Sequence, residues 1–151
     1  MKHASLTTPF GGLILTEEDG AITALGWGQA TRQDCSDLLD TALSQLNEYA
    51  TGKRQCFDLP LRIKGSDFQR AVCTAMLSIP FGHTRTYGEI ARDLGVPAQA
   101  VGGACGGNPI PIIIPCHRVM GAKGLTGFSG AGGVKTKVAL LRHEGAAGLL
   151  I

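Results

Sequence analysis

The segment NPIPIIIPCHRV, residues 108–119, restricts the fold and the chemistry of this chain more than any other stretch. Its middle, residues 110–114, is apolar and rich in β-branched isoleucine, which is typical of a short buried strand. We expect this strand to deliver Cys116 to the edge of a glycine-rich loop, held between Pro115 and His117. Free cysteines often behave as small buried hydrophobes, but one fixed between a proline and an imidazole is better suited to be a nucleophile.

Three helices are predicted before this segment. Residues 66–79 start with the capping-box pattern Ser-Asp-Phe-Gln and continue with apolar residues at helical spacing. Residues 87–94 and 97–105 would form two shorter helices, with Gly95 in the turn between them. Helix, glycine-containing turn and helix make a helix-turn-helix arrangement, although these residues alone fit a simple αα-corner equally well.

The second helix of this pair has no arginine or lysine. A helix that reads base edges in the major groove needs bidentate donors such as arginine or asparagine, so a sequence-specific repressor is disfavoured. A smooth helix can instead lie close to a minor groove, where shape and backbone dominate recognition. We therefore predict sequence-independent DNA contact through the small residues of this helix, which are Ala98, Ala100, Gly102 and Gly103.

The first part of the chain, residues 1–65, has a different pattern. Short apolar runs at 13–15 and 22–27 flank a turn, which predicts an antiparallel hairpin. Residues 36–51 carry apolar residues at helical spacing, and nothing in this part has a catalytic pattern. We expect an α+β protein with a supporting lobe at 1–65 and a mostly helical lobe at 66–151.

The composition of the 151 residues fits one domain, or two small lobes that share a core. The net charge of +2 is uneven, because residues 1–65 carry six basic and eight acidic side chains and residues 66–151 carry eight and four. Phosphate contact therefore suits the second part better. No apolar run reaches the length of a membrane span and the N-terminus lacks a signal-peptide core, so we expect a cytoplasmic protein without membrane contact.

Cysteine usage bears on metal and redox chemistry. The five cysteines cannot all pair, and their spacing matches no zinc-ligand pattern. Unpaired thiols fit a reducing compartment. Residues 1–65 offer only His3, Cys35 and Cys56 as soft ligands, which is too few for a closed structural zinc site. We therefore expect no metal and no cofactor.

A series of short motifs makes the chain resemble the O6-alkylguanine-DNA alkyltransferases, also called methylated-DNA–protein-cysteine methyltransferases. The resemblance runs from about Ser66 to Gly145, and Asn-Pro followed by Pro-Cys-His-Arg-Val is its most specific part. It implies a ribonuclease-H-like first lobe and a winged-helix-like second lobe. The motifs are YGEIA at 87–91, AVG at 100–102, NP at 108–109, PCHRV at 115–119, GFSG at 127–130 and LLRHEG at 140–145.

The resemblance also implies a function, which is DNA repair by direct reversal of damage. After base flipping, the alkyl group on O6 of guanine in double-stranded DNA would pass to Cys116 without a cofactor. The reaction would be stoichiometric, because a thioether is a poor leaving group and nothing in the sequence regenerates the thiol. We expect a monomer in solution. Cooperative assembly on DNA, and the preference among methyl, larger alkyl groups and O4-alkylthymine, stay open.

Displacement at an alkyl carbon needs a strong, soft nucleophile, and a free thiol with a pKa of about 8.5 is mostly protonated at neutral pH. His117 is the obvious base, but neighbours on an extended strand point to opposite faces, so direct contact with Cys116 cannot be assumed. In the family this histidine acts through a bridging water and is oriented by a glutamate, whose matching position is Glu144. Glu144 closes a helix predicted from about Val134, where its charge opposes the helix dipole, so a role other than helix stability is indicated.

Substrate contacts come from the resemblance alone. Tyr87 matches the tyrosine that donates to N3 of the flipped guanine, and Ser129 matches the residue whose backbone N–H contacts O6. The backbone carbonyls of Val119 and Cys116 would face the exocyclic amine. Phe128 stands where the family commonly has tyrosine, and it lacks the hydroxyl group.

Supporting roles come from the resemblance as well. Asn108 matches the residue that ties the helix-turn-helix to the active-site loop, and Arg118 is expected to form an internal ion pair. Lys135 resembles the lysine on the helix after this loop, with its role left open. Gln99 takes the place of the arginine that the family usually inserts into the base stack. Because it lacks the charge and planar stacking of a guanidinium, weaker flipping or reduced affinity is expected.

Three alternatives are weighed against this function. A non-catalytic protein that recognises alkylated bases would share the fold but replace the cysteine, commonly by tryptophan, so Cys116 argues against it. A hydrolytic or redox enzyme using Cys116 and His117 would need an oxyanion hole or a resolving cysteine, and Cys105 has no C-x-x-C relation to Cys116. A transcription regulator is disfavoured by the bare second helix.

Overall fold

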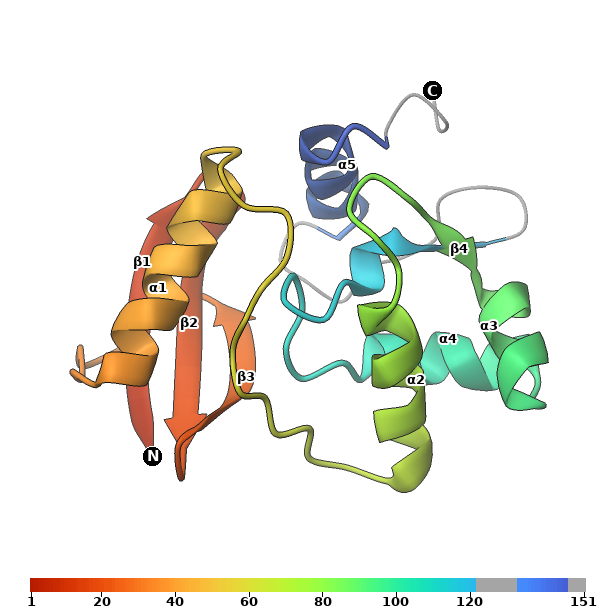
Figure 1. Cartoon of the computed structure of the whole chain (residues 1–151), viewed down its shortest axis with the longest axis horizontal. Helices are drawn as coiled ribbons and strands as arrows, with labels where there is room; N and C mark the ends of the chain where they lie inside the picture. Colours follow the sequence, from red (N-terminus) through yellow and green to blue (C-terminus); the bar gives the residue numbers. More distant parts are fainter. Residues whose placement is uncertain (122–132, 147–151) are drawn as a thin grey trace. The chain divides into compact units, whose positions relative to one another are not determined.

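The computed structural model describes residues 1–121 and 133–146 and divides the chain into two compact units, Met1–Lys64 and Gly65–Ile151 (Figure 1). The first unit contains a small sheet and one helix, and the second is mainly helical. This is the α+β class expected from the sequence.

The first unit is built on an antiparallel sheet of β1 (Lys2–Thr8), β2 (Gly11–Glu18) and β3 (Ala21–Trp27), in that order. The predicted hairpin is confirmed as β2 and β3, and β1 is an additional strand that the sequence did not reveal. Asp19 and Gly20 both have positive φ, 48° and 78°, as the tight two-residue turn of such a hairpin requires.

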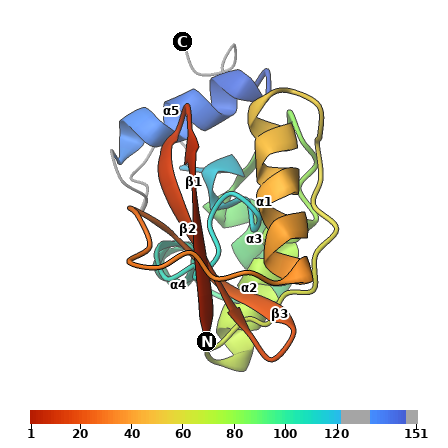
Figure 2. The same ribbon diagram turned by 90° about the vertical axis from the view of Figure 1, so that its left-hand side faces the viewer.

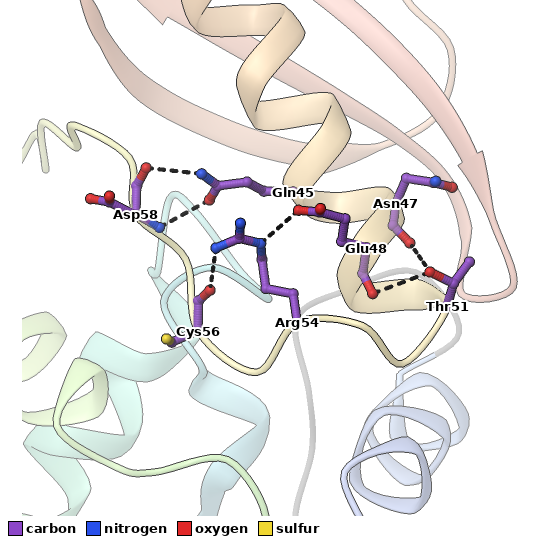
Figure 3. Close-up of polar contacts among 7 residues, drawn as sticks. All are labelled: Gln45, Asn47, Glu48, Thr51, Arg54, Cys56 and Asp58. Carbon is purple, nitrogen blue, oxygen red and sulfur yellow. Dashed lines mark hydrogen bonds and ion pairs between the residues drawn. The ribbon is translucent and has the colours of Figure 1, made fainter.

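Helix α1 (Asp37–Ala50) lies along one face of this sheet in both views (Figures 1 and 2), and it matches the helix predicted for 36–51. Its side chains hold the segment that follows it (Figure 3). The Gln45 side-chain amide donates to Asp58 O at 3.1 Å and accepts from Asp58 N at 2.9 Å. It thus pairs with both backbone groups of Asp58, as the backbone of a neighbouring strand would. Arg54 pairs with Glu48 at 2.9 Å, so residues after α1 are tied back to the helix by polar contacts.

The three helices predicted before residues 108–119 are confirmed in the second unit. They are α2 (Asp67–Leu77), α3 (Tyr87–Leu94) and α4 (Ala98–Gly106). Gly95 ends α3 in the left-handed conformation, with φ 69°, and so makes the turn into α4.

The predicted capping box at the start of α2 forms only in part. Ser66 Oγ accepts from Gln69 N at 3.0 Å, but the Gln69 side chain donates to Ala104 O of α4 at 2.8 Å instead of returning to Ser66. A complete capping box occurs at α3, between Thr86 and Glu89.

The remaining elements of the second unit are two short strands, a 3-10 turn and a helix. Strand β4 (Arg85–Thr86) pairs in parallel with β5 (Val119–Met120), and the 3-10 turn η1 (Cys116–Arg118) comes directly before β5. Helix α5 (Val134–His143) begins where the sequence placed it and has Glu144 as its C-cap.

Residues 110–114 are buried, as predicted, but they do not form a strand. The chain folds back on itself, with Ile114 N donating to Ile110 O at 2.8 Å and Ile113 N donating to Pro111 O at 2.9 Å. Proline has no N–H to give to a strand ladder, and Pro111 interrupts the isoleucines. Ile112 has φ 71°, a strained conformation for a β-branched residue.

The longest described helix, α1, has 14 residues. Within residues 1–121 and 133–146, no helix combines the length and apolar character needed to cross a membrane.

Candidate active site

Cys116 is the first residue of η1 and is only 4% exposed. Its backbone N–H donates to Ile114 O at 2.8 Å, and the same carbonyl accepts from Asn108 Nδ2 at 2.8 Å. Asn108 Oδ1 in turn accepts from Ile110 N at 3.0 Å. Asn108 follows α4, and its side chain bonds to Ile110 and Ile114, the two ends of the turn at residues 110–114. One side chain therefore connects the helix-turn-helix to the loop that carries Cys116.

The surroundings of the Cys116 thiol act on its acidity in opposite directions. Burial raises its pKa, because a thiolate loses more hydration than a thiol. Hydrogen bonding by the Asn108 side chain and the positive charge of Lys137 act against that rise. Because burial dominates, formation of the thiolate needs a base close by.

Glu144 joins His117 and Arg118 in a buried cluster. His117 Nε2 lies 2.7 Å from Glu144 Oε2, and since a carboxylate only accepts, this nitrogen carries the hydrogen. Arg118 makes a two-pronged contact with the same carboxylate, through Nε at 2.7 Å and Nη2 at 3.0 Å. The internal ion pair expected of Arg118 is therefore confirmed, and these partners explain why a carboxylate stands at the unfavourable end of α5.

His117 is fully buried, and its other ring nitrogen, Nδ1, has no hydrogen-bond partner among the described residues. Burial lowers the pKa of His117, Glu144 opposes this effect, and the cations of Arg118 and Lys137 reinforce it. The imidazole is thus neutral near pH 7, with its hydrogen on Nε2 and a lone pair on Nδ1.

Lys137 is the site residue that the sequence analysis missed. It is fully buried on α5, and its Nζ donates to Val119 O at 2.6 Å and lies 5.9 Å from the centre of the Tyr87 ring. Lys135, named from the resemblance, is exposed. The available signal was helical spacing, because Lys137 precedes Leu140 and Leu141 by three and four residues and so shares their buried face.

The residues predicted to contact DNA lie along α4. Ala98, Gln99 and Gly103 are exposed, and Ala100 and Gly102 are partly exposed. A Cβ placed on Gly102 or Gly103 would meet nothing within 4 Å, so packing within the described residues does not require glycine there. Two predicted substrate contacts, Phe128 and Ser129, lie outside the described residues.

The other four cysteines have different surroundings. Burial is the main cause that raises the pKa of Cys73 and brings that of Cys105 to about 12. Cys35 and Cys56 are exposed. In the part of the chain that the structure describes, no group of three or more histidine, cysteine or acidic residues could hold a metal ion.

Comparison with known families matches both units of the chain. Residues 1–63 match the ribonuclease-like domain of 6-O-methylguanine DNA methyltransferase, and residues 67–146 match its DNA-binding domain. The chain therefore belongs to the 6-O-methylguanine DNA methyltransferase family.

Individual relatives are similar over nearly their whole length. A methylated-DNA–protein-cysteine methyltransferase of Methanosarcina barkeri is 51% identical over 95% of this chain and 97% of its own. One from Mycobacterium tuberculosis is 42% identical over 95% and 92%. The crystal structure of Mycobacterium tuberculosis OGT in complex with DNA superposes with a TM-score of 0.87 at 42% identity, covering 97% of this chain and 94% of that one.

Proposed function

We propose that this protein repairs double-stranded DNA by moving the alkyl group from O6 of guanine to Sγ of Cys116. The observation that carries the proposal is the buried arrangement of a cysteine, a neutral histidine and a carboxylate, with Glu144 2.7 Å from His117. Relatives of the chain that carry the name methylated-DNA–protein-cysteine methyltransferase support the reaction.

In the proposed reaction the Cys116 proton passes to Nδ1 of His117 through a water molecule, and the electron pair stays on sulfur. The new S–C bond then forms as the C–O6 bond breaks, and the bonding electrons leave with guanine. Tyr87 is assigned the hydrogen bond to N3, which stabilises that leaving group. Its place beside Lys137 supports this role, since a cation near a phenol makes the hydroxyl a stronger donor.

Lys137 favours the same reaction through charge. Its ammonium group acts electrostatically on Cys116 and lowers the pKa of that thiol. Its hydrogen bond to Val119 O fixes the backbone that is assigned to the exocyclic amine of the base. Ser129 is assigned the contact to O6 and Phe128 a wall of the substrate site, both on the resemblance alone.

DNA is the assigned partner, with α4 against the minor groove and Gln99 as the residue inserted where the base leaves. Glycine inside a helix is destabilising by roughly 0.5–1 kcal/mol relative to alanine. Gly102 and Gly103 have open surroundings in the described residues, so close approach of a partner would account for their lack of side chains. The absence of arginine and lysine from α4 supports contact that is independent of base sequence.

The transfer needs no cofactor and takes place once per chain, because a thioether is a poor leaving group. Five free cysteines fit a reducing compartment, and we assign the activity to the cytoplasm.

Intact-mass analysis tests this function after incubation with a duplex that contains O6-methylguanine. One methyl group per chain is expected, located on the peptide that carries Cys116. Cys116→Ser should abolish transfer and keep DNA binding, since a hydroxyl is far less acidic than a thiol, whereas the matched Cys105→Ser should still react. Label on any of the other four cysteines would refute the assignment.

A further inference from the structure

One carboxylate in the second unit has two different partners. Glu144 accepts from His117 through Oε2, and from Arg118 through both oxygens, at 2.7, 2.7 and 3.0 Å. The side chains of His117 and Glu144 are 0% exposed and that of Arg118 is 8% exposed. Water therefore screens these charges poorly, and the interactions are strong.

Arg118 has further contacts that fix its position. Its Nη1 donates to Ile79 O at 2.6 Å, and its guanidinium lies 5.9 Å from the centre of the Phe81 ring. With Nε and Nη2 on Glu144, the guanidinium contacts both the segment after α2 and the end of α5. It cannot leave the carboxylate without losing several buried hydrogen bonds.

The charge balance of the cluster follows from these contacts. A buried carboxylate beside an imidazole would by itself favour the imidazolium form, because the two opposite charges attract. Arg118 already neutralises Glu144, so a proton added to His117 would leave the three side chains with a net positive charge. It would also place an N–H at Nδ1, which is buried without a partner among the described residues.

We propose that Arg118 is a positioning residue that keeps His117 neutral and able to accept the proton of Cys116, by compensating the charge of Glu144. The proposal rests on the proposed function in one respect, which is that Cys116 must lose a proton during transfer. An imidazolium could not accept that proton, whereas a neutral ring with its hydrogen fixed on Nε2 offers Nδ1 for it.

Two other charged groups act on His117. Lys137 on α5 also disfavours a proton on the imidazole, whereas Glu144 favours one. The thiol of Cys116 belongs to the residue before His117 on η1. Glu144 is the one anion among the described residues that contacts the ring. Removing Arg118 would leave the charge of Glu144 uncompensated, so that only burial and Lys137 would still oppose it, and protonation of His117 would become easier.

The first test reads the protonation of His117 directly and does not depend on alkyl transfer. Proteins labelled with 15N-histidine are titrated by NMR, and His117 is assigned by the signal lost in His117→Gln. In the unsubstituted protein we expect a neutral ring with hydrogen on Nε2 throughout pH 6–8. Arg118→Gln should raise the midpoint of protonation by roughly 1–3 pH units, the range for a nearby charge.

Two variants control for charge and for structure. Arg118→Lys keeps a cation beside Glu144 and should move the midpoint less than Arg118→Gln does. Arg70→Gln removes an exposed arginine that pairs with Asp67 at the start of α2, and it should leave the midpoint unchanged. If Arg118→Gln does not fold, the unsubstituted protein decides, because an imidazolium at pH 7 would overturn the proposal.

The second test measures the rate of methyl transfer against pH for the same proteins. Arg118→Gln should move the acid limb of the profile to higher pH, and rates at high pH should recover. A folded Arg118→Gln protein with an unchanged acid limb and an unchanged His117 midpoint would overturn the proposal. If Arg118→Gln shifts the midpoint but the unsubstituted protein transfers no methyl group, the proposed function is refuted and the effect of Arg118 on His117 still stands.

Discussion

Neighbouring groups, rather than burial, distinguish Cys105 from Cys116. Cys105 and Cys116 are both buried, and burial raises the pKa of both. They differ in their neighbours, since Cys116 has the Asn108 side chain and is followed by His117, the proposed base, whereas Cys105 contacts the sulfur of Met76 at 3.6 Å. A thiol next to a thioether sulfur has no base there to take its proton, so we expect Cys116 rather than Cys105 to react.

Gln99 stands where the resemblance to the family implies an arginine. It is exposed near the start of α4, where it is free to enter a base stack. A neutral amide should stabilise an extrahelical base less well than a guanidinium does, because it lacks the charge and the planar cation stacking. Gln99→Arg should therefore speed repair of O6-methylguanine in a duplex, measured by single-turnover kinetics.

The control for this variant is a substrate that needs no flipping. The rate with free O6-benzylguanine should change little, since only the step on the duplex is affected. The new charge also attracts phosphate, so the rates are compared at several salt concentrations. A gain that disappears at high salt would reflect general attraction and would contradict the base-flipping explanation.

Helix α4 has a composition that its own stability does not explain. Gly102, Gly103 and Gly106 lie in a helix of nine residues, and a Cβ at any of them would meet nothing within 4 Å in the described residues. Alanine would give a more stable helix at these positions. The glycines are explained if the surface of α4 must approach a DNA backbone closely.

Gly103→Ala tests this explanation. The substitution should raise the free energy of unfolding by about 0.5–1 kcal/mol, measured by urea denaturation. Affinity for duplex DNA should fall at the same time, because the added methyl group prevents α4 from approaching the DNA backbone closely. Gly26→Ala in β3 has equally open surroundings and should leave DNA affinity unchanged. Tighter DNA binding by Gly103→Ala would contradict the close approach.

Most elements of this protein could be predicted from the sequence because their signals are local. Apolar spacing was enough to place α1, and Gly95 marked the turn of the helix-turn-helix. Residues 110–114 misled the prediction because their composition favours a strand, while Pro111 and the positive φ of Ile112 make a turn. Burial was correctly predicted because it follows from hydrophobicity, which does not depend on backbone conformation.

Those residues of the candidate site that belong to one short motif, or to the pattern of the family, could be predicted. Cys116 and His117 are adjacent in one motif, and the resemblance pairs Glu144 with His117, which it contacts in the structure. Lys137 was not predictable in the same way, because a lysine usually lies on the surface and Lys135 nearby is a competing choice. Its burial depends on Val119 O as a partner, which only the tertiary fold provides.

The described residues of the site all belong to the second unit, so a change at Cys116 acts on the packing of that unit. Cys116 is 4% exposed, and Asn108 holds the turn before it against the end of α4. A methyl group on Sγ must find space among these buried groups. Overpacking of this kind is destabilising by about 1–3 kcal/mol.

Complete methylation should therefore lower the melting temperature by several degrees, measured by differential scanning calorimetry after removal of DNA. Hydrogen exchange should increase around residues 108–115, because loss of the Asn108 contacts loosens the turn first. Cys116→Ser carried through the same incubation separates methylation from any effect of the DNA. If the methylated protein melts at the same or a higher temperature, the site accommodates the methyl group without strain, and the reacted protein keeps the packing of the free one.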